Sequence, residues 1–336
     1  MEPNKDSEKE KEYHEEISDP NEKKILEDFK RCIATITDKK DREVLDIFVL
    51  SDNDLLIHFL RANKLDVKKA TNMLLEYFHW KAKVNLDNLY SNYTWKNKNK
   101  MLLLLPHGFH KITKEGYPVY FQIMGKLDSD EFFKLITPEE LVTYSTKIYE
   151  TMYRDYFKLC SKIKDRYVYG VFNIIDFKDV KVTSLLSKNL LKYLNESTNI
   201  MQNYYPESIA NIYAINTGFA FRAFYAAVKF FLDAKTKESI KVFDENYQEG
   251  LLERIDKECL PTFYGGTCEC PGGCLFSNAG PWKKEDEKEE ELPEDIIKGR
   301  KEVTEYMFKR NINNDNNDNS EKINNQGKEG VNPDNL

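Results

Sequence analysis

The sequence predicts an α/β protein in which a small N-terminal helical bundle packs on an α/β lobe with a mixed or parallel sheet. Three observations predict this architecture. Apolar residues recur at helical spacing between residues 21 and 84. From about residue 106 onward, short apolar strands alternate with helices, which is the pattern of a sheet with helical crossovers. Residues 219–232 read as a helix that is apolar on nearly every face.

The first elements in the chain are predicted to be helices. Residues 1–21 are acidic and poor in apolar residues, so we expect a disordered tail there. The bundle is assigned to residues 22–95. Ser51 and Asp54 have the spacing of a capping box, and Asp66 can cap the next helix. In that helix the apolar residues Ala70, Met73, Leu74 and Tyr77 recur at helical spacing.

The lobe is assigned to residues 96–282 and begins with two strands, 107–113 and 118–124, joined by a Lys-Glu-Gly turn. Thr137, Pro138 and Glu140 form a strong helix start. The remaining expected elements are strands 168–175, 212–215 and 240–243 and helices 137–159, 183–196, 199–204, 219–232 and 248–255. Residues 283–336 are acidic and Asn-rich, so we expect a disordered tail, with a short helix near 294–308 as the alternative.

Charge and hydropathy exclude several classes of protein. The net charge is −7 over 336 residues, with −5 in residues 1–21 and −5 in 283–336, so the middle of the chain carries +3. That balance suits a surface that visits anionic membranes and is too weak to predict nucleic-acid binding. The start of the chain lacks the apolar region of a secretory signal, and no apolar run reaches 18 residues. We therefore expect a cytoplasmic protein with reduced thiols.

The apolar helix 219–232 has two interpretations. It is either a core helix of a large domain or a mobile flap over a lipid-sized cavity. Its aromatic residues are numerous, and a highly charged sequence follows it.

No catalytic motif is convincing. The sequence lacks G-x-S-x-G, a P-loop, G-x-G-x-x-G and H-E-x-x-H. Cys160 and Arg166 have the C-x5-R spacing of thiolate phosphatases, but the segment between them is Lys-rich and has no Gly for a phosphate cradle. The five histidines are scattered and are interpreted as packing or surface residues. No catalytic residue, cofactor or metal is predicted.

Four cysteines lie close together in the sequence, at positions 259, 268, 270 and 274. They are interpreted as structural thiols, with a zinc site or a redox disulfide as the alternatives, because their spacing is not a standard zinc pattern.

Six segments, in this order, resemble the CRAL-TRIO lipid-binding family, and in particular its phosphatidylinositol/phosphatidylcholine transfer proteins. They are Leu55-Leu56 to Val67 with Trp80-Lys81; Lys114 to Tyr120; Gln202-Asn203-Tyr204-Tyr205-Pro206-Glu207; Phe230 to Asp233; Leu260-Pro261 with Tyr264-Gly265-Gly266; and Gly280-Pro281-Trp282. The resemblance covers roughly residues 50–282. Each motif is short, and the specificity lies in their ordered occurrence together.

The resemblance implies a sheet that floors a pocket for one phospholipid, with helix 219–232 as the gate. It implies a non-enzymatic protein that binds, transfers or presents phosphatidylinositol, and with it phosphatidylcholine, between membranes and lipid kinases. Such a protein would be a cytoplasmic monomer, peripheral at Golgi, ER or plasma membranes, that contacts the membrane surface transiently. A carrier of a sterol, tocopherol or retinoid is the alternative, and a lipid phosphatase is a further one.

The resemblance also implies site residues. For the lipid headgroup they are Lys64, Glu207, Thr236, Lys237 and Lys241, where Lys237 and Lys241 stand in for the family's strand lysine at Ser239 and would share a face if the segment were extended. Asn63 occupies a position that is basic in the inositol-lipid members. For the lipid pocket they are Phe109, Tyr120, Tyr149, Val171 and Asn173. For the gate they are Phe221, Phe224, Tyr225 and Phe231.

Overall fold

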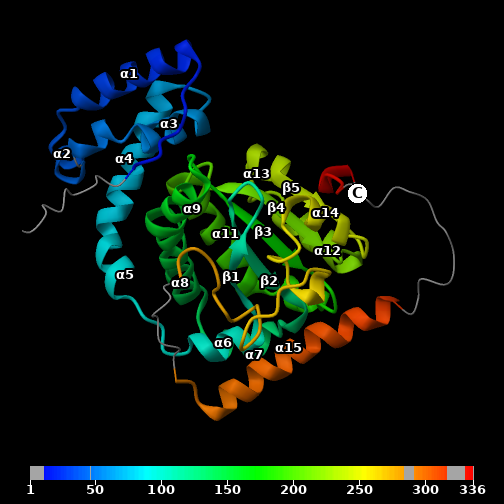
Figure 1. Cartoon of the computed structure of the whole chain (residues 1–336). Helices are drawn as coiled ribbons and strands as arrows, with labels where there is room; N and C mark the ends of the chain where they lie inside the picture. Colours follow the sequence, from blue (N-terminus) through cyan, green and yellow to red (C-terminus); the bar gives the residue numbers. More distant parts are fainter. Residues whose placement is uncertain (1–10, 46, 284–290, 316–329, 336) are drawn as a thin grey trace, which may run out of the picture.

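The computed structural model describes residues 11–45, 47–283, 291–315 and 330–335. Six α-helices come first in the chain, and the last of them lies against the lobe, apart from the N-terminal bundle (Figure 1). Asp66 caps the fourth of them as predicted, by accepting a hydrogen bond from the backbone N–H of Lys69 at 3.0 Å. The helices are α1 (Pro20–Ala34), α2 (Lys39–Val44), α3 (Asn53–Ala62), α4 (Val67–Lys83), α5 (Leu86–Asn92) and α6 (Lys98–Leu104).

The capping box predicted at Ser51 and Asp54 is wrong. Asp52 caps α3 instead, and its side chain accepts from the N–H of Leu55 at 2.9 Å. Asp54 is engaged elsewhere: its carboxylate contacts His14 Nδ1 at 2.9 Å and accepts from the Glu15 N–H at 2.8 Å. Residues 11–19 are therefore held against the bundle, which corrects the prediction of a disordered tail for that part; residues 1–10 lie outside the described residues.

Five strands form one mixed sheet, as predicted, and the structure gives their order as β1-β2-β3-β4-β5. The first two strands pair antiparallel across the Lys114–Gly116 turn, and the other neighbours pair parallel through helical crossovers. The strands are β1 (His107–Ile112), β2 (Pro118–Ile123), β3 (Val171–Asp176), β4 (Ile209–Ile215) and β5 (Ile240–Val242).

The lobe's helices cover the two faces of this sheet. Helix α8 starts at the predicted capping box, in which Glu140 N–H donates to Thr137 Oγ1 and Thr137 N–H donates to the Glu140 carboxylate. The helices are α7 (Ser129–Leu135), α8 (Pro138–Thr151), α9 (Phe157–Lys164), α10 (Val182–Leu185), α11 (Lys188–Tyr204), α12 (Phe219–Val228), α13 (Ala234–Ser239), α14 (Gln248–Arg254) and α15 (Glu294–Asp315).

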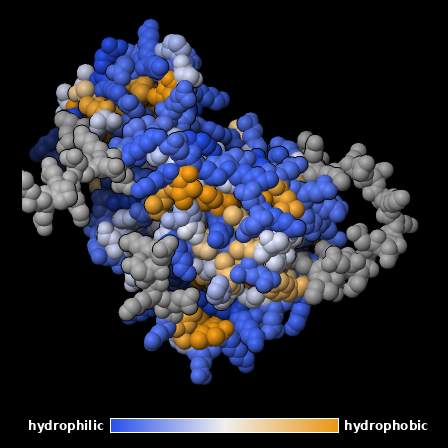
Figure 2. Space-filling model, in the orientation of Figure 1, coloured by the Kyte–Doolittle hydropathy of each residue, from blue (hydrophilic) through white to orange (hydrophobic). Residues whose placement is uncertain are grey.

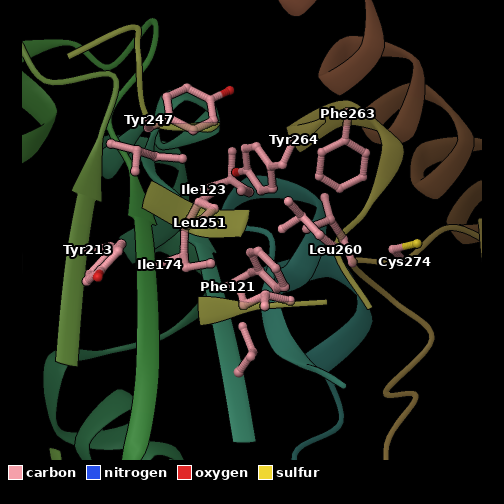
Figure 3. Close-up of a cluster of buried hydrophobic side chains, with 14 of the residues drawn as sticks. Phe121, Ile123, Ile174, Tyr213, Tyr247, Leu251, Leu260, Phe263, Tyr264 and Cys274 are labelled. Atoms are coloured by element: carbon pink, nitrogen blue, oxygen red, sulfur yellow. The ribbon is translucent and has the colours of Figure 1, made fainter. Parts of the chain in front are cut away.

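One face of the sheet is a closed hydrophobic core (Figure 3). Alternate residues of the central strands point into it because side chains alternate along a strand. Figure 3 shows Tyr247 and Leu251 of the α14 region and Tyr264 packed over this face. The strand residues on it are Val119, Phe121, Ile123, Phe172, Ile174, Tyr213 and Ile215.

Residues 291–315 and 330–335 belong to the fold, which corrects, for these parts, the prediction of a disordered tail over residues 283–336. Helix α15 runs along the lobe (Figure 1) and buries Val303 and Met307 in the core of Figure 3. Its Arg310 is buried and forms an ion pair with Asp176 at the end of β3. Farther along, Val331 pairs antiparallel with Val242 of β5. Residues 284–290, 316–329 and 336 lie outside the described residues.

Candidate functional site

The predicted pocket residues lie together on the sheet face opposite the core of Figure 3. Phe109 of β1, Tyr120 of β2 and Asn173 of β3 stand side by side in register, and Ile212 of β4 continues the row. The Phe109 and Tyr120 rings meet edge to face at 4.9 Å. Phe109, Tyr120 and Val171 share a hydrophobic cluster with Tyr149 from α8. The strand pairing therefore joins residues that are up to a hundred positions apart in sequence.

Hydroxyl groups line this face among the apolar side chains. The Tyr149 hydroxyl is 2.6 Å from Ser197 Oγ, and the Tyr193 hydroxyl is 2.8 Å from Ser145 Oγ. Burial raises the pKa of both tyrosines, so both hydroxyls stay protonated. These pairs connect α8 to α11 and fix the wall above the sheet.

Tyr120 differs from its neighbours. Burial raises its pKa well above the ordinary value, yet its side chain is only half-buried. Among the described residues, its hydroxyl has no hydrogen-bond partner. This half-buried hydroxyl is therefore free to donate to, or accept from, a bound polar group. Two surface hollows, one beside Tyr306 on α15 and one beside Tyr93, are lined by none of the predicted pocket residues.

The predicted gate helix is α12, which is shorter than expected because it ends at Val228. Phe221 and Tyr225 are buried, and the Phe221 ring packs edge to face on Phe177 at 5.0 Å. Phe224 and Phe231 are half-buried. α12 therefore covers part of the same side of the sheet as Ile212 and Ala214.

The exposed aromatic residues of this segment are ones that the sequence reasoning did not select. Phe219, the first residue of the helix, is 72% exposed, and Phe230, two residues past its end, is 79% exposed. Figure 2 shows apolar patches between hydrophilic residues on the face of the molecule drawn in Figure 1. Gly218 precedes the helix, and nothing lies within 4 Å of the position that a side chain would take there.

Glu207 is the centre of a polar corner between the bundle and the lobe. Its carboxylate is 3.2 Å from His58 Nδ1 of α3 and forms an ion pair with Lys235 of α13. Burial alone would raise the pKa of Glu207, but the hydrogen bonds from His58 and Lys235 outweigh burial and lower it. The corner adjoins the aromatic face, because Tyr205 packs on Tyr149 and donates to Glu150 of α8 at 2.6 Å.

The other residues predicted for the headgroup site differ in burial and in the element that holds them. Thr236 is buried in α13, next to Lys235. Lys64 is exposed in the turn after α3, where its φ is 54°. Asn63 is used locally: its amide donates to the Phe59 carbonyl at 2.9 Å.

The shared face predicted for Lys237 and Lys241 is wrong. Asp233 caps a helix by accepting from the Thr236 N–H, so Lys237 lies in α13 and not in an extended segment. Lys241 lies in β5, and its ammonium is 5.9 Å from the Tyr213 ring centroid, on the core side of the sheet. Sequence reasoning missed Lys235 and His58. His58 was hidden among the apolar residues of α3, and only its contact with Glu207 identifies it.

Cys160 and Arg166 do not form a phosphate cradle. Cys160 is buried in α9, and burial raises the pKa of its thiol to about 12, so the thiol is not ionised near neutral pH. The Arg166 guanidinium donates to the backbone carbonyls of Tyr167 and Glu115.

Comparisons with known proteins agree with this architecture. The CRAL/TRIO domain profile matches residues 105–266, and the CRAL/TRIO N-terminal domain profile matches residues 8–76. The Sec14 cytosolic factor of Schizosaccharomyces pombe is 32% identical over 234 residues, which is 70% of this chain and 81% of that protein. The phosphatidylinositol/phosphatidylcholine transfer protein SFH11 of Arabidopsis thaliana is 32% identical over 271 residues, which is 80% of this chain and 70% of that protein.

A solved structure shares the fold. The crystal structure of Sfh5 superposes with a TM-score of 0.58 at 16% identity and covers 79% of this chain and 93% of that chain. Among the described helices, none is both long and apolar enough to cross a membrane.

Proposed function

Because this chain belongs to the CRAL/TRIO domain family, as its Sec14 and SFH relatives show, we propose that it binds one phospholipid, phosphatidylinositol or phosphatidylcholine, and transfers it between membranes. The acyl chains would lie against the sheet face that carries Phe109, Tyr120 and Asn173, beneath α12. A lipid needs an apolar site with a few convergent polar groups, and this face combines the two. The observation that carries the proposal is the hydroxyl of the half-buried Tyr120 in the middle of that face, which has no hydrogen-bond partner in the part of the chain that the structure describes.

The headgroup site is proposed at the Glu207 corner. Glu207 and Thr236 were predicted there from the sequence, and Lys235 supplies a cation beside them. An ammonium group contributes a charge-assisted hydrogen bond to a phosphate. Lys64 stays a candidate for the same role from the turn after α3. Presentation of the lipid to kinases, action at Golgi, ER or plasma membranes, and a monomeric state are parts of the same proposal.

A transfer assay between vesicles tests this function. The purified chain should move labelled phosphatidylinositol and phosphatidylcholine from donor to acceptor vesicles without changing either lipid chemically. Lys235→Met should reduce phosphatidylinositol transfer about tenfold, the value of one charge-assisted contact, and reduce phosphatidylcholine transfer less. Lys241→Met is the matched control, because that lysine lies on the other side of the sheet. Transfer of neither lipid would refute the proposed function, and an equal loss of both in Lys235→Met would remove Lys235 from the headgroup site.

A further inference from the structure

Four metal-binding side chains converge at a place that the lipid site does not use. His110 comes from β1, and Cys268, Cys270 and Cys274 come from the segment that follows Tyr264. Their ligand atoms all lie within 4.8 Å of one another. The three cysteines are free thiols, and the group is buried or half-buried. Cys259, which the sequence places in the same cluster, is not a member, and a histidine more than 150 residues away takes its place.

The spacing of the sulfur atoms fits a tetrahedral metal ion. Zinc binds thiolate sulfur at about 2.3 Å, so two sulfurs at adjacent tetrahedral corners should be about 3.8 Å apart. Cys268 Sγ and Cys270 Sγ are 3.8 Å apart. Three thiolates and one imidazole are a common ligand set of structural zinc sites, and soft sulfur ligands disfavour magnesium and calcium.

His110 is oriented so that its Nε2 atom is available to bind a metal ion. Ser277 Oγ donates its proton to the Cys274 carbonyl at 3.0 Å, so it accepts from the Nδ1–H of His110 at 3.1 Å. That assigns the lone pair to Nε2, and Nε2 is buried without a hydrogen-bond partner among the described residues. Metal-binding histidines characteristically donate their other ring N–H to an oxygen acceptor, as His110 does here.

The backbone around these residues is shaped to aim them. His110 and Lys111 together stand opposite Val119, because the pairing of β1 with β2 shifts register between Phe109 and Ile112. Such a bulge redirects a side chain, and here Lys111 has φ 60° while its N–H bonds to the Ala279 carbonyl. Before Cys274, Gly272 and Gly273 have φ 73° and 91°, conformations that glycine adopts without strain.

We propose that His110, Cys268, Cys270 and Cys274 bind one zinc ion in a closed, structural site. The ion would fasten the segment from Cys268 to Trp282 onto the edge strand β1. That attachment bears on the proposed lipid site, because the Trp282 ring packs on Phe109 at 5.8 Å and stacks on Tyr156 at 4.2 Å. The zinc site stands independently of the lipid that the protein carries.

Metal analysis of the full chain tests the proposal. The protein should be expressed without a histidine tag, kept reduced, dialysed against buffer that holds no metal, and measured by mass spectrometry for metals. We expect about one zinc per chain, the stoichiometry of a four-ligand site. Cys270→Ser should lose the zinc, and Cys259→Ser, the matched control, should keep it. Less than about a tenth of a zinc per wild-type chain, or equal zinc in the Cys270→Ser and wild-type proteins, would overturn the proposal.

A measurement on the wild-type chain covers the case in which Cys270→Ser does not fold. After zinc is removed with a chelator, Co²⁺ alone is titrated into the reduced protein. Binding at one equivalent should produce the visible absorption of tetrahedral cobalt and its thiolate charge-transfer band, and zinc should displace it. The thermal midpoint should fall on chelation and return with zinc. Absence of the cobalt spectrum, or a thermal midpoint that chelation leaves unchanged, would contradict the proposal.

Discussion

On the aromatic face of the sheet, substitutions of two tyrosines distinguish a role in ligand binding from a role in folding. The Tyr120 hydroxyl has no protein partner among the described residues, whereas the Tyr149 hydroxyl bonds to Ser197. Tyr120→Phe should therefore keep the thermal midpoint and weaken lipid binding by two- to tenfold, the value of one neutral hydrogen bond of about 0.5–1.5 kcal/mol. Tyr149→Phe is the control, which should lower stability instead. Unchanged lipid affinity in Tyr120→Phe, measured by fluorescent-lipid displacement, would contradict this assignment.

His107 makes stability depend on pH. Burial lowers its pKa from 6.5 to about 4, against a smaller raising effect from the Leu105 carbonyl, which is 2.7 Å from Nδ1. The unfolded chain binds this proton at a higher pH than the folded chain, so stability falls as the pH drops from about 6.5 to about 4. Between pH 7 and pH 5, protonation of His107 in the unfolded chain should lower the free energy of unfolding by about 2 kcal/mol.

The measurement is urea unfolding of the wild type and of His107→Gln at both pH values. The variant should lose less stability between pH 7 and pH 5 than the wild type. The matched control is His79→Gln, because His79 is partly exposed in the bundle and contacts Asp41. An identical pH dependence in His107→Gln and the wild type would show that another group titrates.

Among the elements, α12 and the residues just after it carry two exposed aromatic side chains, Phe219 and Phe230. Phe219 and Phe230 contribute little to the folded core, whereas Phe221 is buried against Phe177. The double variant Phe219→Asp, Phe230→Asp should weaken binding to anionic vesicles and slow lipid exchange, since each aromatic side chain moved into the membrane interface contributes about 1.5–3 kcal/mol. Its helical content should be unchanged. Unaltered vesicle sedimentation of this variant would exclude α12 as the membrane contact.

Helix α15 is joined to the sheet by a buried ion pair. Arg310 is 5% exposed and pairs with Asp176, which also accepts from the Tyr264 hydroxyl at 2.7 Å. Arg310→Met leaves a buried carboxylate without its cation, so we expect a loss of about 3–5 kcal/mol in the free energy of unfolding. The neighbouring Lys309→Met, at an exposed position, should cost less than about 0.5 kcal/mol. Equal urea midpoints for the two variants would contradict this role of α15.

The helices and strands also show which features of the fold sequence patterns can predict and which they cannot. The positions of the strands and the capping residues Asp66 and Thr137 follow from apolar periodicity and local hydrogen-bonding chemistry, which act over a few residues. Helix α15 was underestimated because its apolar residues Ile296, Val303 and Met307 are dispersed among charged ones, and burial depends on a distant partner.

The candidate site, like the fold, was predicted from the sequence only in part. The row of Phe109, Tyr120 and Asn173 was predicted only through family resemblance. Strand pairing brings these residues together, and no local sequence pattern predicts that pairing. The cations around Glu207 were misjudged, because the Asp233 cap converts an assumed strand into α13 and moves Lys235 to the carboxylate. His110 was classed as a packing or surface residue, since its neighbours in the metal cluster lie more than 150 positions away.

In the whole molecule, the two faces of one sheet differ in what covers them. One face is closed by the core of Figure 3 and by α15, and the other carries aromatic and hydroxyl groups beneath α12. The N-terminal bundle contacts the lobe at the Glu207 corner, where His58 meets Glu207, and nearby the Trp80 ring stacks on Tyr204 at 4.3 Å. A closed face can hold the fold rigid while the other face exchanges a ligand.

The central claim is that this second face holds a phospholipid, and the most direct test is to identify what the protein carries. The full chain is purified from a eukaryotic host, and its lipids are extracted and quantified by mass spectrometry. We predict about one phosphatidylinositol or phosphatidylcholine per chain, strongly reduced in Asn173→Trp, which fills the row beside Tyr120, and retained in Lys241→Trp on the opposite side of the sheet. A sterol or another hydrophobic ligand in place of phospholipid, or equal phospholipid in the Asn173→Trp and wild-type proteins, would contradict the claim.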